Sequence, residues 1–291
     1  MTRTFPVDWV DAFTDAPFGG NGCAVVHGGA ELDDETAMRF VRETSLVECT
    51  FTGPSDVADV KVRYFLASRE IPFAGHPTVA TVAALKARGL MAGDRVTLET
   101  GAGLVPVVLR DRWIEMTQVA PQFGPQPDVA LVADVAGLDA GDIIAPPQLV
   151  STGLPFVITV LKDHEALRRA RLNPEALRRL AQSLGHDGTD LMEPFLVTLS
   201  GATGQGDTFS RLLLAPPSPP EDPFTGSATG AMAAYLWRYG LMRKDSFLAE
   251  QGHWMGRPGQ ARVTRVGPAD AMDGIRVAGQ AWRLMSGDLH L

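Results

Sequence analysis

The sequence has 291 residues, of which 45% are hydrophobic and 21% are charged, with a formal net charge of -8. This composition is typical of a folded soluble protein, and the length suits two domains of ordinary size better than one core. The acidic balance without a lysine- and arginine-rich stripe argues against nucleic acid as a partner, and no apolar run approaches the ~18 residues of a membrane span.

The first part of the chain alternates strand and helix patterns. Strands are predicted at 5–13, 23–26, 48–51, 60–65, 95–99, 104–109 and 113–116, and helices at 33–45 and 78–88. The second of these helices is apolar on nearly all sides, which is typical of a buried helix, and Gly89 ends it. A Pro-rich segment at 120–127 indicates the crossing into a second domain.

The second part follows a similar scheme. Strands are predicted at 150–161 around a bend at Gly153, and at 195–199, 209–214, 261–266, 274–278 and 281–285, with helices at 174–184 and 229–241. The one dense group of arginines is typical of a solvated helix face, and it contains Arg168, Arg169, Arg171, Arg178 and Arg179.

An internal repeat links the two halves. The segment 72–85 aligns without gaps on 223–236 at an offset of 151 residues, and seven of the fourteen positions are identical. In each copy a glycine, Gly75 or Gly226, permits a tight turn and a helix follows. The start of a helix presents free N–H groups and the positive end of its dipole, which favours an anion. We therefore expect the site to lie where the two copies face each other and to hold one small anionic molecule.

Reactive side chains cluster in sequence around these turns. His76 follows Gly75, Ser227 follows Gly226, and Asp222 precedes the second copy. Glu48 lies among apolar residues, a setting that suits a general acid or base. Structural interpretations stay open for each: Glu48 as an outward-facing strand residue, His76 and Ser227 as helix caps, and Asp222 as an Asx-turn residue.

These segments resemble the signatures of a known family. Phe73–Thr78 and Glu221–Ala228, together with 7–13, 18–26, 48–51 and 251–259, are similar to the PhzF-like phenazine-biosynthesis family. The resemblance implies an α+β fold of the diaminopimelate epimerase type. Its two pseudo-symmetric lobes are each a curved, mostly antiparallel sheet or barrel around one central helix. The implied domains are 1–118, joined by a C-terminal strand at about 280–291, and 119–279.

The resemblance also implies a function. The family reaction is the cofactor-independent isomerisation of a dihydro-hydroxyanthranilate, in which a carboxylate removes a proton from carbon and returns it elsewhere. Glu48 would carry the proton and His76 and Asp222 would lie beside the polar groups of the substrate. The substrate-binding residues would be Asn21, Gly75, Gly226 and Ser227. Two departures affect the pocket: Val47 stands where many members have serine, and Gly22 stands where many have proline.

Other chemistries have less support. Two-thiol racemases of the same fold need a cysteine before each helix-start glycine, and Ala74 and Thr225 occupy those positions. Cys23 and Cys49 are best interpreted as small buried residues. The six histidines show no metal-ligand spacing, and the loop 201–206 lacks the Gly-Lys-Ser/Thr of a phosphate loop. A small-molecule binding protein without catalysis and an epimerase of another substrate both stay open.

The chain's setting is also predicted. Two cysteines in a chain of this length form no disulfide framework, and the N-terminus lacks the apolar core of a signal peptide. We therefore expect a cytoplasmic protein. The resemblance implies a homodimer.

Overall fold

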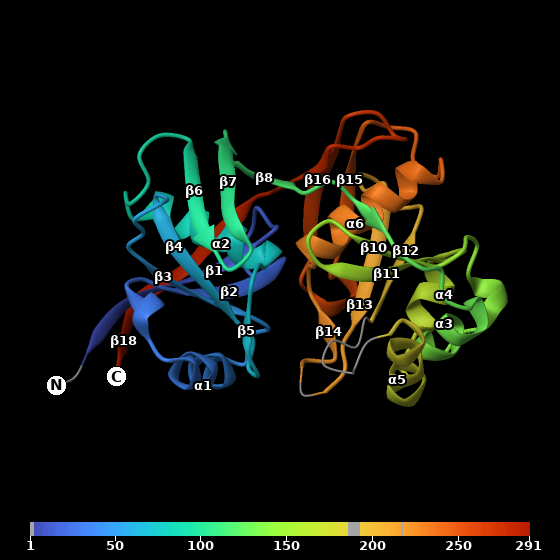
Figure 1. The fold of residues 1–291 in the computed structure, drawn as a ribbon, viewed down its shortest axis with the longest axis horizontal. Helices are drawn as coiled ribbons and strands as arrows, with labels where there is room; N and C mark the ends of the chain where they lie inside the picture. Colours follow the sequence, from blue (N-terminus) through green and yellow to red (C-terminus); the bar gives the residue numbers. More distant parts are fainter. Residues whose placement is uncertain (1–2, 186–192, 217) are drawn as a thin grey trace. The chain divides into compact units, whose positions relative to one another are not determined.

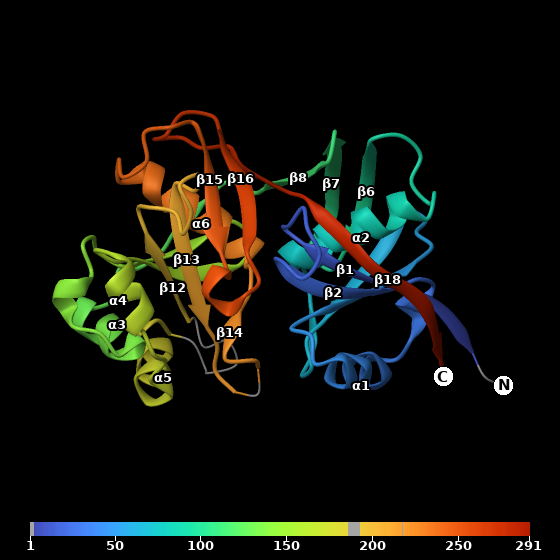
Figure 2. The ribbon, with the colours of Figure 1, turned by 180° about the vertical axis from the view of Figure 1, so that it is seen from behind.

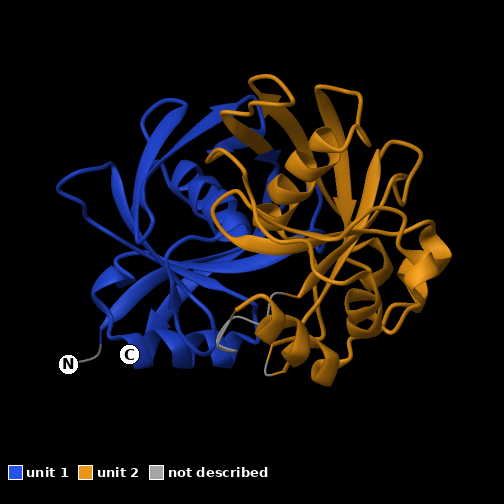
Figure 3. Cartoon of the chain, turned by 45° about the vertical axis from the view of Figure 1, so that its right-hand side comes forward, with its two compact units in different colours: residues 1–117, 278–291 blue, residues 118–277 orange. Residues whose placement is uncertain are grey.

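The computed structural model describes residues 3–185, 193–216 and 218–291, which form two compact units (Figure 3). Unit 1 runs to Thr117 and also includes Ala278–Leu291, and unit 2 is Gln118–Val277. No described helix has the length and apolar character needed to cross a membrane.

Unit 1 is a curved sheet with one helix inside it and another outside (Figures 1 and 2). Its strands are β1 (Thr4–Ala12), β2 (Asn21–Val26), β3 (Cys49–Gly53), β4 (Val60–Phe65), β5 (Glu70–Ile71), β6 (Arg95–Thr100), β7 (Gly103–Arg110), β8 (Trp113–Gln118) and β18 (Ala281–His290). Its helices are η1 (Gly29–Glu31), α1 (Asp34–Thr44) and α2 (Gly75–Ala87). The last strand, β18, pairs antiparallel with β1, so both ends of the chain contribute to this sheet.

Unit 2 has the same kind of architecture with more helices at its edge. Its strands are β9 (Gln122–Phe123), β10 (Gln148–Ser151), β11 (Pro155–Val160), β12 (Pro194–Thr198), β13 (Thr208–Leu213), β14 (Glu221–Asp222), β15 (Ser246–Gln251), β16 (Gly259–Val266) and β17 (Gly274–Gly279). Its helices are α3 (Val129–Ala136), η2 (Ala140–Asp142), α4 (His164–Arg169), α5 (Pro174–Ser183), α6 (Gly226–Arg238) and η3 (His253–Met255).

The two units share one strand topology. In unit 1 the pairs β1–β2, β3–β4 and β6–β7 are antiparallel, and β2–β3 and β4–β6 are parallel. In unit 2 the pairs β10–β11, β12–β13 and β15–β16 are antiparallel, and β11–β12 and β13–β15 are parallel. The order of pair types is the same, which confirms the predicted α+β fold with two pseudo-symmetric, mostly antiparallel lobes.

The repeat is longer in structure than in sequence. The offset of 151 residues relates the first residues of β5 and β14, of α2 and α6, and of β6 and β15. It also relates two close approaches: a Cβ on Gly101 would lie 2.9 Å from Pro72 Cα, and one on Gly252 would lie 2.5 Å from the Pro223 carbonyl oxygen. The absence of a side chain at each glycine lets the chain after β6 or β15 pack against the turn before the helix.

A bidentate ion pair is repeated as well. Arg63 on β4 pairs with Glu70 on β5, with its Nη2 2.6 Å from Oε2, and Arg211 on β13 pairs with Glu221 on β14 at 2.7 Å. Each pair joins a long strand to the two-residue strand that leads into the central helix. Bidentate geometry of this kind fixes the direction of the strand as well as adding energy.

The central helices begin earlier than the pattern of apolar residues predicts. α2 starts at Gly75 and α6 at Gly226, each three residues before the predicted position, so the glycines are the first helical residues. Both helices are buried along most of their length, α2 against β1, β2, β3 and β18, and α6 against β10, β11 and β16. Their burial confirms the interpretation of each as a core helix.

A buried carboxylate, Asp8, ties β1 to the end of α2 and to β18. It is fully buried and accepts hydrogen bonds from Arg88, from Ser286 and, at 2.9 Å, from His27 Nε2, and Arg283 lies 3.8 Å away. Burial raises the pKa of Asp8, but the hydrogen bonds from Arg88, Ser286 and His27 outweigh it and lower the pKa overall. Arg88 is the C-cap of α2, where a positive charge also complements the helix dipole.

His27 makes the stability of the folded protein depend on pH. Burial lowers the pKa of His27 in the folded protein, and the hydrogen bond to Asp8 only partly opposes this. The unfolded chain therefore binds a proton that the folded chain does not, so stability falls as pH drops through about 6.5, the ordinary histidine value. We expect His27→Gln to flatten the rise in unfolding free energy between pH 5 and 7, measured by urea denaturation. An unchanged slope would contradict the neutral, buried state of His27.

Candidate functional site

Three of the predicted site residues meet in unit 1. His76 Nδ1 lies 3.6 Å from Glu48 Oε2 and 3.2 Å from Asn21 Nδ2. His76 and Asn21 are buried, and the side chain of Glu48 keeps 16% of its surface exposed. Glu48 is therefore the most exposed side chain of this cluster, although its Oε2, the oxygen facing His76, is itself buried.

Local structure fixes each member of this cluster. Asn21 is the first residue of β2, and Glu48 directly precedes β3, which runs parallel to β2. His76 is the second residue of α2, whose start is packed through Thr78, because Thr78 shares a 2.7 Å hydrogen bond with the buried Tyr64 hydroxyl. The interpretation of His76 as a helix cap has no support here, since no side chain caps α2.

The cluster is built to hold a proton next to Glu48. An Nδ1 without a proton and an ionised carboxylate are both acceptors, so their 3.6 Å approach is favourable when one of the two carries a proton. Asn21 can serve both states, because its amide N–H donates to a bare Nδ1 and its oxygen, after rotation of the amide, accepts from a protonated one. Such an arrangement suits a carboxylate that takes up and returns a proton.

The two thiols near Glu48 are not suited to take up and return a proton. Cys23 and Cys49 are fully buried, and burial raises the pKa of Cys23 well above its ordinary value and that of Cys49 to about 12. A thiol with so high a pKa is protonated at neutral pH and is a poor acid–base group. The prediction that both cysteines are small buried residues is confirmed.

Unit 2 holds the other predicted residues at the start of α6. The Thr225 hydroxyl donates to Oδ2 of Asp222, three residues earlier in the turn. The buried Gln251 side chain braces this turn, accepting from Thr225 N at 3.0 Å and donating to the Asp222 carbonyl oxygen at 2.8 Å. Asp222 and Ser227 are both buried, with 5% and 8% exposure.

Neither helix start is capped by a side chain, yet the two differ in what they offer. At α6, Thr225 is the N-cap but its hydroxyl donates to Asp222, so the first N–H groups, at Gly226, Ser227 and Ala228, donate to no capping side chain. At α2, Pro77 occupies the position of Ala228 and has no N–H. The second copy therefore presents one more backbone donor and the Ser227 hydroxyl, which makes it the better start for an anion.

A glutamine that the sequence interpretation missed supports α6. Gln118 Nε2 donates to the Gly226 carbonyl oxygen at 3.0 Å, and its Oε1 accepts from the Thr152 hydroxyl at 2.6 Å. It fits only because residue 230 is glycine, since a Cβ there would lie 1.7 Å from Gln118 Oε1. The aligned residue of the first copy is Val79, so this support exists in one copy alone.

We expect Gly230→Ala to couple strongly to Gln118. Alanine favours the helix by about 1 kcal/mol over glycine, but the added methyl expels Gln118 and breaks both of its hydrogen bonds, at a cost of about 1–3 kcal/mol. In a Gln118→Ala background the same substitution should stabilise the protein. A double-mutant cycle by urea denaturation measures this, and additive effects would show that Gln118 does not need the space.

Comparison with known proteins identifies the family of this chain. The model of the family described as phenazine biosynthesis-like protein matches residues 10–287. The chain belongs to this family. It is 31% identical over 266 residues to the uncharacterized isomerase YfhB of Bacillus subtilis, covering 87% of this chain and 88% of that protein. It is 30% identical over 277 residues to trans-2,3-dihydro-3-hydroxyanthranilate isomerase of Pseudomonas chlororaphis, covering 93% and 94%.

Solved structures of the family have the same fold. A PhzF-family protein from Bacillus anthracis superposes with a TM-score of 0.85 at 28% identity, covering 99% of both chains. A hydroxyproline epimerase from Agrobacterium vitis superposes with a TM-score of 0.63 at 16% identity, which indicates the shared fold alone. This phenazine biosynthesis-like protein therefore has the epimerase-like fold that its motifs predict.

The structure brings together some of the predicted site residues. Glu48, His76 and Asn21 form one group, and Asp222, Gly226 and Ser227 form another, each within its own unit. Gly75 is the first residue of α2, beside His76. The roles assigned to all seven stay predictions, as does the expectation that the two turns face each other. Among the described residues, no three His, Cys, Asp or Glu side chains are grouped as metal ligands.

Proposed function

We propose that this protein is a cofactor-independent isomerase that moves a proton on a small carboxylate-bearing metabolite, with Glu48 as the proton carrier. The observation that carries the proposal is the Glu48 carboxylate, on a partly exposed side chain, whose buried Oε2 is held 3.6 Å from His76 Nδ1. Relatives named as isomerases support the general class of reaction, and one of them is named for trans-2,3-dihydro-3-hydroxyanthranilate. We take that compound as the first substrate to test.

The chemistry follows from the side chains. Glu48 removes a proton from a carbon of the substrate and delivers it to another carbon of the conjugated system, so no bond other than C–H bonds and double bonds changes. His76 Nδ1 lies beside the carboxylate and can share its proton, and Asn21 hydrogen-bonds to this nitrogen. The N–H groups at the start of α6 and the Ser227 hydroxyl suit the substrate carboxylate.

Single-carboxylate chemistry fits better than two-thiol chemistry. The residues before the two helix starts are Ala74 and Thr225, and neither forms a thiolate. Thr225 also gives its hydroxyl to Asp222, which leaves it no free proton for the substrate. The buried Cys23 and Cys49 thiols have raised pKa values, so they are unsuited to replace the missing pair.

Solvent-proton exchange tests the proposal. Purified protein is incubated in deuterium oxide with trans-2,3-dihydro-3-hydroxyanthranilate and with a panel of cyclic carboxylates, and deuterium incorporation into carbon is followed by mass spectrometry and NMR. We expect one or more compounds to gain deuterium and isomerise without added cofactor or metal. Tight binding of such a compound with no exchange would instead support a binding protein that has lost the chemistry.

A further inference from the structure

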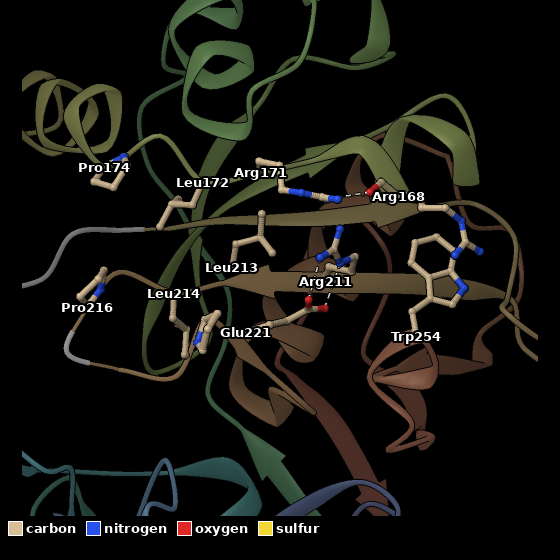
Figure 4. A pocket seen from close by; sticks show the side chains of 11 residues that line it. Arg168, Arg171, Leu172, Pro174, Arg211, Leu213, Leu214, Pro216, Glu221 and Trp254 are labelled. Carbon is tan, nitrogen blue, oxygen red and sulfur yellow. Dashed lines mark hydrogen bonds and ion pairs between the residues drawn. The ribbon is translucent and has the colours of Figure 1, made fainter.

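Unit 2 contains a cavity that the proposed reaction does not use. Its volume is about 470 Å³, within the range of small-molecule sites, and it lies between the α4–α5 segment and strands β13 and β14. Figure 4 shows its two ends: Arg168 lies over Trp254 at one, and leucine and proline side chains such as Leu172 and Leu214 line the other.

This cavity lies on the opposite side of the sheet from Asp222. Successive residues of a strand point to opposite faces, and Glu221 of β14 lines the cavity while Asp222 does not. The paired strand repeats the pattern, since Arg211 and Leu213 of β13 line the cavity and Leu212, the partner of Asp222, does not. The cavity is thus separate from the candidate site residues of this unit.

The cavity has an excess of positive charge. Three arginines, Arg168, Arg171 and Arg211, line it against one carboxylate, Glu221, in a chain whose net charge is -8. Arg211 is fully engaged, because it pairs with Glu221 and donates to the carbonyl oxygens of Leu167 and Ala170. Glu221 therefore balances Arg211 and leaves the other two arginines without a countercharge.

Arg168 and Arg171 lack an acidic partner in the part of the chain that the structure describes. Arg171 uses one nitrogen, Nη1, for the carbonyl oxygens of Arg168 and Ala170, at 2.9 and 2.8 Å. Arg168 makes a cation–π contact, its Cζ 4.0 Å from the centre of the Trp254 ring. By contrast, the neighbouring Arg169 pairs with Asp142 and Glu165, and Arg179 pairs with Asp134. All five arginines of this group are exposed, as predicted, but they lie on α4, on α5 and between the two and not on one helix face.

We propose that this cavity binds a small organic carboxylate with an apolar body. The carboxylate would take the open N–H groups of Arg168 and Arg171, which match its planar geometry, and the apolar body would lie against the leucine and proline end. Trp254, held by ring contacts with Phe209 and His164, gives the charged end a rigid wall. Arg171 and Arg211 also donate to backbone carbonyl oxygens at the end of α4, which gives them a structural role. Arg168 has no such bond to any described residue, so a structural role does not account for its position over Trp254.

The test uses 2-naphthoate as the probe, with the neutral 2-naphthylmethanol as its matched control. Binding of each compound to the whole protein is measured by titration calorimetry. We expect 2-naphthoate to bind and the neutral control to bind at least about tenfold more weakly, because a charge-assisted hydrogen bond is lost. Failure of the probe to bind would overturn the proposal.

Two matched variants locate the binding. Arg168→Gln should raise the dissociation constant of 2-naphthoate about tenfold, whereas Arg178→Gln removes another exposed arginine, outside the cavity, and should leave it unchanged. Equal effects of the two variants would show that 2-naphthoate is attracted by the general positive charge of this surface, which would overturn a specific site in the cavity. A loss of 2-naphthoate affinity in Arg168→Gln with exchange activity intact would place the probe in this cavity, and unchanged affinity in this variant would overturn the proposal. Loss of exchange activity alone would bear on the proposed function only.

Discussion

Glu48→Gln is expected to lower solvent-deuterium incorporation into substrate by about 10²–10⁴-fold or more, because a glutamine amide cannot take up a proton from carbon. The substitution keeps the size of the side chain, and the amide can still hydrogen-bond with His76, whose Nδ1 is 3.6 Å from the carboxylate. Binding of 3-hydroxyanthranilate, an aromatic compound of the substrate type, should therefore change only a few-fold. The loss should appear in kcat and not in KM.

The matched control is Glu43→Gln, an exposed glutamate in the last turn of α1, five residues before Glu48. It removes the same charge from the same unit, so an electrostatic effect on substrate approach would appear in both variants. Full exchange activity in Glu48→Gln would show that another group carries the proton. His76→Asn then becomes the informative variant, since it removes the other group that shares this proton.

Much of the fold follows from the sequence because the repeat and the motifs constrain one another. The strand pattern of 60–65 corresponds to β4 at the same residues, since Val, Tyr and Phe alternate with Lys and Arg. The core helices are recognised by their alanines, but their starts are misplaced by three residues. Gly75 and His76 give no apolar periodicity, and only the tight turn before them shows that the helix has begun.

Other elements escape prediction for physical reasons. β15 reads Ser-Phe-Leu-Ala-Glu-Gln, and its buried Glu250 and Gln251 break the alternation that identifies a strand. Tertiary partners explain both: Glu250 accepts from Thr203, and Gln251 braces the start of α6. α3 had a local signal that the Pro-rich surroundings obscured, because Asp128 caps it by accepting from Leu131 N at 3.0 Å.

The candidate site also contains both residues that the sequence predicts and residues that it does not. Glu48, His76 and Asp222 are visible in sequence because they stand in recognisable motifs. Gln118 and Thr152 are not, since they lie far in sequence from the helix start they support. Gln118 bonds to the Gly226 carbonyl oxygen at 3.0 Å, and Thr152 bonds to Gln118 at 2.6 Å. The one available signal was Gly230, a glycine inside a helix that interrupts an otherwise apolar pattern and so indicates close approach of another group.

Asp8→Asn is expected to destabilise unit 1 by about 3 kcal/mol at pH 7, measured by urea denaturation, because it leaves partly buried positive charge without its partner. Asp8 is fully buried and joins Arg88, His27 and Ser286 from three separate segments. We place the effect near the lower end of the range for broken buried pairs, since the Arg88 side chain is 25% exposed and water can solvate it in part.

The pH dependence of this loss separates charge from shape. The pKa of Asp8 is lowered in the folded protein, so the stability it contributes is present above its ordinary value of 3.8 and is lost as pH falls through the lower folded value. Wild type and Asp8→Asn should therefore converge in acid and differ most near neutral pH. Asp288→Asn on β18, which removes an exposed carboxylate from the same sheet, should be neutral to within about 0.5 kcal/mol at every pH. A gap between wild type and Asp8→Asn that persists unchanged in acid would mean that Asp8 holds β1, α2 and β18 together through hydrogen-bond geometry and not through charge.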